Sequence, residues 1–371
     1  MSRLNNGKVA DKLLHSGKNC INKKMTNNCR GDSLILAHVV FRHGHRTPLG
    51  KSELYPTDPH NNNTYFPIGF GQLTNQGKQK MYDLGKELRK RYNGLLGDVY
   101  YPDVVDARST KSARTIASLQ YCLAGLFPPN EYQLWNKDLN WQAIPVYYKE
   151  REDDKELLGV DSSEYFHKYS ENLQSDFWQQ EFKTYQETFD YINEHSGLNM
   201  SNFWDTYLLY FGLKTETECG LELPKWWDKV WPEKITEMAI RQYSIAYTKS
   251  EMKKLCCGLF FNKIIEDTMK KIKEPRGNEF EKKMYLYSVH DSNMAMLLFA
   301  LGAFDNCIPK YGSYISFEVH KINDTFGFKI YYQNYEKPEP VSVILPNCQE
   351  FCPLDDFVAF LKDILPDKTE N

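Results

Sequence analysis

Two apolar runs of similar length each end abruptly in charged and small residues. Residues 34–40 run into Arg42-His43-Gly44-His45-Arg46-Thr47-Pro48, and residues 284–289 run into His290-Asp291. Short runs rich in β-branched or aromatic residues, halted by charge, glycine or proline, are typical of buried strands that end in loops. Reactive side chains at two strand ends predict a ligand site in the crevice beyond the carboxyl ends of an α/β sheet.

A third segment between these two repeats the same design. Residues 104–107 are predicted as a strand that leads to Arg108 and then to Ser109-Thr110, after which apolar residues recur at helical spacing. Residues 292–298, after His290-Asp291, likewise predict a capped helix. Three such units would deliver their side chains to one crevice. We therefore predict an α/β fold with a mixed, mostly parallel central sheet flanked by helices.

The remaining periodicity supplies the other elements of this sheet domain. Thr74 is expected to cap a helix with one apolar face, and the sheet is expected to hold about six strands. The further predicted elements are a strand at 141–148, a hairpin of 314–321 and 326–335 about Asn323-Asp324, and a closing helix at 355–364.

The middle of the chain differs in pattern from both flanks. Residues 150–275 are aromatic, charged and helical in spacing. We predict a smaller α-helical cap domain inserted here, between the two parts of the α/β domain at 33–149 and 276–371. The aromatic residues of the cap are expected to form its core. Residues 1–32 are polar and rich in Lys and Asn, and they predict a disordered extension.

The turn after the first strand carries the candidate chemistry. Arg42 and Arg46 offer planar forks of donors that match a phosphate or a carboxylate. Gly44 permits close approach of the backbone, and His43 is the candidate nucleophile or base. A single arginine at a strand end is ordinarily a solvated charge, and a lone histidine is ordinarily structural. Two arginines around two histidines within five residues favour an anion site.

These motifs, in this order, resemble the histidine acid phosphatase family, in its acid phosphatase and phytase branch. The resemblance rests on residues 42–48 together with His290-Asp291, and it also takes in Arg108-Ser109-Thr110. It extends over residues 33 to 365 and is greatest toward the prostatic and lysosomal acid phosphatases. The expected activity is therefore hydrolysis of phosphate monoesters.

The resemblance implies the same roles that the chemistry of the residues suggests. A phosphate monoester presents a dianion, so cationic or donor side chains must hold its oxygens before a nucleophile can approach. His43 is predicted to attack phosphorus and form a phosphohistidine, and Asp291 is predicted to protonate the leaving oxygen. His45 is assigned to the pocket rim. The predicted phosphate-binding residues are Arg42, Arg46, Arg108 and His290. This scheme requires neither a metal ion nor a cofactor.

Three alternatives are weighed against this reading. In a zinc hydrolase, His43, His45, His290 and Asp291 would be ligands, but arginines crowding the cation disfavour it. A catalytically silent phosphate-binding protein would be expected to lack His43 or Asp291. A phytase-like enzyme or a lysophosphatidic acid phosphatase stays within the family. The acidic character of residues 150–161 favours a broad-range monoesterase over a phytase, which needs a wide basic pocket.

Charge and hydropathy limit the partners. The net charge of −3 leaves no basic surplus to neutralise a nucleic-acid backbone, so we expect no nucleic-acid binding. No run of eighteen apolar residues is present, so no transmembrane segment is expected. The expected partner is a phosphate monoester on a small molecule or on a protein. The oligomeric state, including a homodimer, stays open.

The cysteines and the amino terminus give conflicting indications of the compartment. Cys348 and Cys352 lie in a Pro-bounded loop where a short disulfide is feasible, and the resemblance implies that bridge. It also implies a bridged Cys219, but the partner position holds Tyr314, with Cys307 seven residues earlier. The resemblance implies a secreted or lysosomal protein. The first residues show no apolar signal-peptide region, which keeps a cytoplasmic location open. The sequons that glycosylation would use are Asn62, Asn199 and Asn323.

Overall fold

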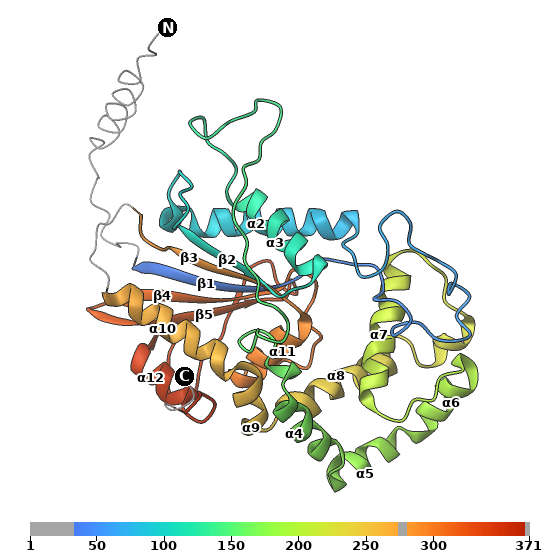
Figure 1. The fold of residues 1–371 in the computed structure, drawn as a ribbon. Helices are drawn as coiled ribbons and strands as arrows, with labels where there is room; N and C mark the ends of the chain where they lie inside the picture. The colour runs from blue at the N-terminus through green and yellow to red at the C-terminus, as the bar shows by residue number, and fades with distance from the viewer. Residues whose placement is uncertain (1–32, 274–279, 368–371) are drawn as a thin grey trace, which may run out of the picture. The chain divides into compact units, whose positions relative to one another are not determined.

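A seven-stranded mixed sheet forms the centre of the computed structural model, which describes residues 33–273 and 280–367 (Figure 1). The strand order is β2-β3-β1-β4-β5-β6, and β7 also pairs with β5. The parallel strands are β1 (Leu34–Arg42), β2 (Val105–Ser109) and β3 (Met284–Val289). The antiparallel strands are β4 (Tyr314–Ile322), β5 (Thr325–Gln333), β6 (Val341–Ser342) and β7 (Cys352–Pro353). The predicted mixed α/β sheet is confirmed.

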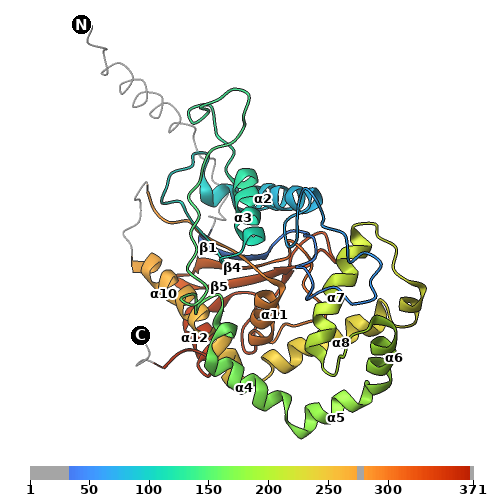
Figure 2. The same ribbon diagram turned by 45° about the vertical axis from the view of Figure 1, so that its right-hand side comes forward.

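Helices cover both faces of this sheet (Figures 1 and 2). One face is covered by α2 (Asn75–Leu96) and α3 (Ala113–Leu126), which pack on alternate strand residues such as Val39 and Ala107. The opposite face is covered by α10 (Leu259–Lys273), α11 (Asp291–Ala300) and α12 (Leu354–Leu361). Because strand side chains alternate between faces, each buried strand contributes to two separate cores.

The predicted cap region is helical. Its elements are η1 (Gly159–Asp161), α4 (Ser163–Leu173), α5 (Asp176–Thr184), α6 (Gln186–Ser196), α7 (Phe203–Glu218), η2 (Lys225–Lys229), α8 (Glu233–Tyr247), α9 (Ser250–Lys253) and the π-helical η3 (Lys254–Gly258). Many of its aromatic residues, including Phe203 and Trp227, are buried in the same core as residues of the sheet, whereas Phe177 and Trp204 are exposed. From Leu34 onward the chain forms one compact unit, so the predicted division at 149/150 and 275/276 stays a prediction. The predicted extension at 1–32 lies outside the described residues.

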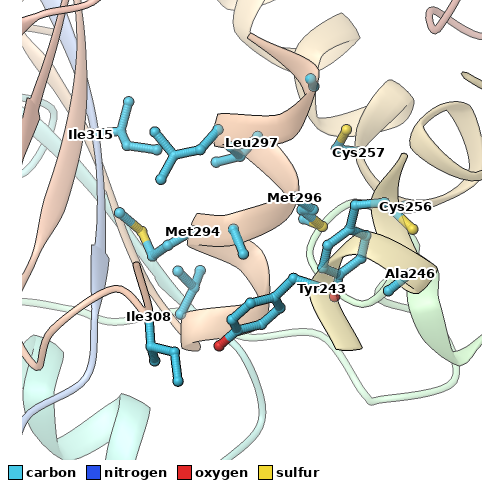
Figure 3. Close-up of a cluster of buried hydrophobic side chains, with 14 of the residues drawn as sticks. Tyr243, Ala246, Cys256, Cys257, Met294, Met296, Leu297, Ile308 and Ile315 are labelled. Carbon is cyan, nitrogen blue, oxygen red and sulfur yellow. The ribbon is translucent and has the colours of Figure 1, made fainter. Parts of the chain in front are cut away.

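Helix α11 joins the sheet to the cap region. Figure 3 shows Met294, Met296 and Leu297 of α11 between Ile315 of β4 on one side and Tyr243 of α8 on the other. All five side chains are buried. A residue at the start of α11 therefore has the sheet on one side and the cap helices on the other.

Several predicted elements are confirmed. The hairpin of β4 and β5 turns at Asn323 and Asp324, whose φ angles of 47° and 63° are the left-handed values that Asn and Asp tolerate. Thr74 caps α2 by accepting a hydrogen bond from the backbone N–H of Gly77. The Cys348–Cys352 disulfide is present. Cys219 and Cys307 are free and exposed.

The predicted strand at 141–148 is wrong. Only Tyr147 pairs with the sheet, through one isolated bridge to Arg108. The segment alternates in polarity because Ile144 and Val146 pack on the α2–α3 core, but this single bridge does not extend into a strand. No helix of the described residues is long and apolar enough to cross a bilayer.

Candidate active site

Three turns meet at the carboxyl ends of the parallel strands. The turn after β1 supplies His43, the start of α3 supplies Arg114, and the turn after β3 supplies His290. Strands β1 and β3 are parallel, and Arg42, the last residue of β1, pairs with Val289, the last residue of β3. The carboxyl ends of the two strands therefore lie side by side. The predicted convergence on one crevice follows from this register.

His43 is held as a neutral imidazole with one nitrogen facing Arg114. Its Nδ1 lies 2.8 Å from the carbonyl oxygen of Gly44, so Nδ1 carries the proton and donates. Its Nε2 accepts a hydrogen bond from Nε of Arg114 at 3.2 Å. Burial, and then the charges of Arg114 and Arg42, hold the pKa of His43 well below its ordinary value. The unprotonated Nε2 has the lone pair that a nucleophile needs, once the hydrogen bond from Arg114 is given up.

His290 faces the same guanidinium from the other side. Its Nδ1 lies 3.2 Å from Nη2 of Arg114, and its Nε2 lies 3.0 Å from the hydroxyl of Thr110. A guanidinium can only donate, so Nδ1 accepts and Nε2 carries the proton. Burial and the charge of Arg114 lower the pKa of His290 well below its ordinary value. The two imidazole rings are 5.5 Å apart between centroids.

Arg114 is the site residue that the sequence reasoning missed. It contacts both imidazoles, and none of the described carboxylates forms an ion pair with it. Burial and the neighbouring charge of Arg46 lower its pKa to about 10. It lies in the first turn of α3, where the helix dipole disfavours a cation. A cation in a helix N-terminal turn just after a strand was the signal that could have identified it, because such a turn favours anionic ligands.

Arg42 and Asp291 form the part of the site nearest the cap region. Nη2 of Arg42 lies 3.5 Å from Oδ1 of Asp291, and Nη1 donates to the carbonyl oxygen of Pro309 at 2.5 Å. The guanidinium also lies over the ring of Tyr311, at 4.0 Å from the centroid. Its Nε has no hydrogen-bond partner within residues 33–273 and 280–367. A buried guanidinium with an unused donor can bind an anion.

Arg46 is buried beside these groups but is bound to a carboxylate. Nη1 and Nη2 donate to Oε2 and Oε1 of Glu53 at 2.7 Å and 2.6 Å. Its Nε has no hydrogen-bond partner. The predicted phosphate contact would therefore use Nε, with Glu53 fixing the plane of the guanidinium.

Arg108 does not lie with the other predicted site residues. Its guanidinium donates to Asp154 and Glu156, two acids of the segment before α4. Strand β2 continues to Ser109, beyond the predicted end at Ala107, so Arg108 still obeys the alternation of the strand. Ala107 faces α2 and α3, and Arg108 faces the opposite side of the sheet. Because both outer nitrogens of Arg108 bind carboxylates, Arg114 is a further candidate for the phosphate contact, and the role predicted for Arg108 stays a prediction.

His45 and Gly44 fix the shape of the turn. Nδ1 of His45 lies 2.7 Å from the hydroxyl of Thr74, and Nε2 lies 3.2 Å from Glu218 of α7. A Cβ on Gly44 would lie 2.6 Å from the carbonyl oxygen of Gly77, so only glycine allows the turn to approach α2 this closely. His45 thus joins the turn to α2 and α7.

The arrangement of the imidazoles does not suit a zinc ion. No group of three or more His, Cys, Asp or Glu among residues 33–273 and 280–367 is placed to hold a metal. The guanidinium of Arg114 lies between His43 and His290, where a shared cation would have to lie.

Comparison with known proteins identifies relatives over most of the chain. The model of the histidine phosphatase superfamily (branch 2) matches residues 33–333. Venom acid phosphatase Acph-1 of Apis mellifera is 36% identical, over 90% of this chain and 86% of that protein. Human prostatic acid phosphatase is 31% identical, over 88% and 84%. Human lysosomal acid phosphatase is 30% identical, over 90% and 79%.

Solved structures support the fold. The phytase of Klebsiella sp. ASR1 superposes with a TM-score of 0.65 and 15% identity, over 90% of this chain and 98% of that one. A phytase of Hafnia alvei in complex with myo-inositol hexakis sulphate gives a TM-score of 0.65 at 16% identity, over 90% and 97%.

Proposed function

The chain belongs to the histidine phosphatase superfamily (branch 2) and is a phosphoric monoester hydrolase, and we propose that it acts through a phosphohistidine at His43. One observation carries this proposal: the lone pair of Nε2 of His43 faces Arg114, a cation that has no ion-paired carboxylate among the described residues. A phosphate group held by that cation would have its phosphorus within reach of Nε2.

The first step transfers the phosphoryl group. Arg114, Arg42 and the unused Nε of Arg46 hold the phosphate oxygens, and one such pair at 4 Å is worth about 4 kcal/mol at an effective dielectric near 20. The lone pair of His43 Nε2 forms the nitrogen–phosphorus bond as the bond from phosphorus to the ester oxygen breaks. That oxygen takes a proton from Asp291 and leaves as an alcohol. His290 contributes a further contact to the phosphate if its Nε2–H turns from Thr110 to a phosphate oxygen.

The second step releases phosphate. Water attacks the phosphohistidine, the carboxylate of Asp291 accepts a proton from that water, and the nitrogen–phosphorus bond breaks. Inorganic phosphate then leaves, and Asp291 is again protonated for the next cycle. The pKa of Asp291 is held below its ordinary value, so the proton needed in the first step is available at acid pH.

A trapping experiment tests this mechanism. The protein is mixed with an excess of a radiolabelled phosphate monoester and quenched in alkali, because phosphohistidine is more labile in acid than in base. Peptide mapping should place the label on the peptide that contains His43. Label on another residue would overturn the assignment, and hydrolysis with no trapped label would favour direct attack by water.

Among substrates, we propose monoesters of modest charge. Acidic side chains adjoin the site, with Glu218 beside His45 and Glu53 on Arg46. Asp154 and Glu156 neutralise Arg108. A hexakisphosphate would bring several dianions toward these carboxylates, so phytase-like turnover should be weak. A screen over phosphorylated sugars, peptides, lysophosphatidic acid and inositol phosphates ranks these classes directly.

We also propose that the protein is secreted or lysosomal, and that it forms a homodimer. The disulfide between Cys348 and Cys352 supports an oxidising compartment. The loop at 128–148 carries exposed aromatic residues, among them Trp135 and Trp141, which supports an interface between two copies. Peptide mapping of protein from its native compartment and sedimentation analysis test the two proposals. Free thiols at both cysteines would favour the cytoplasm.

A further inference from the structure

A buried tyrosine, Tyr243, and a partly buried one, Tyr207, bind the same oxygen of Asp291. The hydroxyl of Tyr207 donates to Oδ2 at 2.6 Å, and the hydroxyl of Tyr243 donates to Oδ2 at 2.5 Å. Asp291 is 6% exposed and Tyr243 is 2% exposed, so water does not compete freely for these bonds. The other carboxylate oxygen, Oδ1, faces Arg42 at 3.5 Å, which is longer than a well-formed hydrogen bond.

The two carboxylate oxygens are therefore not equivalent. A carboxylate oxygen has two lone pairs in its plane, and the two phenols use both lone pairs of Oδ2. Oδ1 keeps a lone pair on the side of Arg42, which is the side of the phosphate site. A proton can bind Oδ1 without displacing either tyrosine.

The tyrosines come from a different part of the fold than the rest of the site. Tyr207 lies on α7 and Tyr243 on α8, whereas Asp291 begins α11. Figure 3 shows the side chain of Tyr243 lying against α11 at the boundary of the sheet and the cap helices. The titratable or charged groups that act most strongly on Asp291 are Arg42, Tyr207, Tyr243 and His290.

We propose that Tyr207 and Tyr243 are positioning residues that occupy Oδ2 of Asp291, so that Oδ1 alone carries the proton delivered to the leaving group. The cap helices thereby set the pH at which the phosphatase protonates its leaving group. This inference rests on the proposed role of Asp291 as general acid. It adds that Oδ1 is the oxygen of Asp291 that carries the proton, and that Tyr207 and Tyr243 help to set the pH at which Asp291 is protonated.

The sign of the effect follows from the donors. A phenol that donates to a carboxylate stabilises its charged form and lowers its pKa. Burial of Asp291 acts in the opposite direction, and the charge of Arg42 together with the two phenols outweighs it, so the pKa of Asp291 is lowered overall. Removing one hydroxyl should therefore raise the pKa of Asp291. The alkaline limb of the pH profile should then move toward higher pH.

The experiment compares Tyr207→Phe, Tyr243→Phe and Tyr165→Phe with the wild type. The burst rate of an alkyl phosphate is measured across pH. Tyr207→Phe and Tyr243→Phe should each move the alkaline limb upward by about one pH unit, the scale of one hydrogen bond to a charged group. At a pH above the wild-type limb, each variant should therefore be about tenfold faster relative to its own maximum.

Tyr165→Phe is the matched control. It also removes a buried hydroxyl from the cap region, but that hydroxyl donates to the carbonyl oxygen of Ala246 and not to Asp291. The alkaline limb of the pH profile of Tyr165→Phe should coincide with that of the wild type. The inference is overturned if the alkaline limb of Tyr207→Phe or of Tyr243→Phe does not move. It is also overturned if the alkaline limb of Tyr165→Phe moves as far as theirs. Failure of the wild type to hydrolyse any monoester would instead overturn the proposed function. The two single variants give independent readings if one of them does not fold.

Discussion

The floor of the site, formed by His43, Arg114 and His290, differs in charge from two other buried arginines, Arg46 and Arg108, which together with their acidic partners are called the ring. In the floor, a guanidinium contacts two neutral imidazoles, and no ion pair to a carboxylate is present among the described residues. In the ring, Arg46 is bound by Glu53, and Arg108 is bound by two acids. The arginines of the ring already have anionic partners, whereas the arginine of the floor does not.

This difference distinguishes an arginine that builds the fold from one that binds a ligand. A buried guanidinium paired with carboxylates satisfies its donors within the protein, and its removal leaves a buried anion without a partner. A guanidinium that faces only imidazoles keeps an uncompensated charge in a crevice. An anionic substrate supplies that compensation, which is why the floor is the better candidate for the phosphate position.

The largest expected effect belongs to His43 in the floor. His43→Ala should lower turnover by at least a hundredfold, since loss of an activated nucleophile costs several kcal/mol. The phosphate position should survive, because Arg114 and Arg42 remain. Vanadate or inorganic phosphate should therefore still raise the Tm of the variant. Stopped-flow kinetics and thermal unfolding measure the two properties, and turnover above a hundredth of the wild type would exclude His43 as the nucleophile.

The next effect compares one arginine of the floor with one of the ring. Arg114→Ala should lower kcat/KM by about a hundredfold to a thousandfold, the scale of a lost transition-state donor, with little change in Tm. It should also abolish the protection that phosphate gives. Arg108→Ala should do the reverse. It leaves Asp154 buried without its cation, which costs about 3–5 kcal/mol of stability.

The two variants serve as controls for each other. Phosphate should raise the Tm of Arg108→Ala as much as that of the wild type, because Arg108 has no contact with either imidazole. Loss of phosphate protection in Arg108→Ala, with protection kept in Arg114→Ala, would reverse the roles assigned to floor and ring.

The sequence predicted the site where the strand boundaries were clear. Charge, glycine and proline follow β1 at once, so His43 could be placed at a strand end. At β2 the polar residues begin inside the strand, and Arg108 was predicted to lie in the turn although it is still paired with Tyr287. Whether such a residue still belongs to the strand or already to the turn decides where its side chain points, because each strand residue faces the side of the sheet opposite its neighbour's.

The contributions of the cap region could not be predicted from the sequence in the same way. Tyr207 and Tyr243 lie on separate helices and reach Asp291 across 84 and 48 residues of sequence. In the sequence they cannot be told from aromatic residues that only fill a helical core, and both do pack in that core. Only the register of α7 and α8 against α11 directs their hydroxyls to a carboxylate. Long-range packing of this kind leaves no local signal.

A smaller effect is expected at Asp291, which lies where floor and ring meet. Asp291→Asn should slow an alkyl phosphate by about a hundredfold or more in the burst phase, because its leaving oxygen requires a proton. A nitrophenyl phosphate should lose much less, since its phenolate leaves unaided. Equal slowing of both esters would mean that Asp291 positions the phosphate or His43.

The loop that carries Glu53 of the ring also carries one member of a carboxyl pair, and no cation forms an ion pair with this pair among the described residues. Asp58, in the loop after the β1 turn, lies beside Glu216 of α7, and neither oxygen of Glu216 has a hydrogen-bond donor among the described residues. Both side chains are buried. Burial and the hydrogen bond with Asp58 raise the pKa of Glu216 to about 8. The pair therefore shares a proton that holds the loop against α7, the opposite of the carboxylate–arginine contacts in the ring.

The smallest effect tests this pair through stability. The folded pKa of about 8 exceeds the ordinary Glu value of 4.5, so the stabilisation is fully present below pH 4.5 and is lost as the pH rises to 8. Glu216→Gln replaces the shared proton with an amide that donates at every pH. The Tm of this variant should exceed that of the wild type by several degrees at pH 8, with the advantage shrinking toward pH 4.5. Glu222→Gln, at an exposed position of the same region, should follow the wild type. A constant difference in Tm between Glu216→Gln and the wild type across this range would mean that Glu216 and Asp58 do not share a proton.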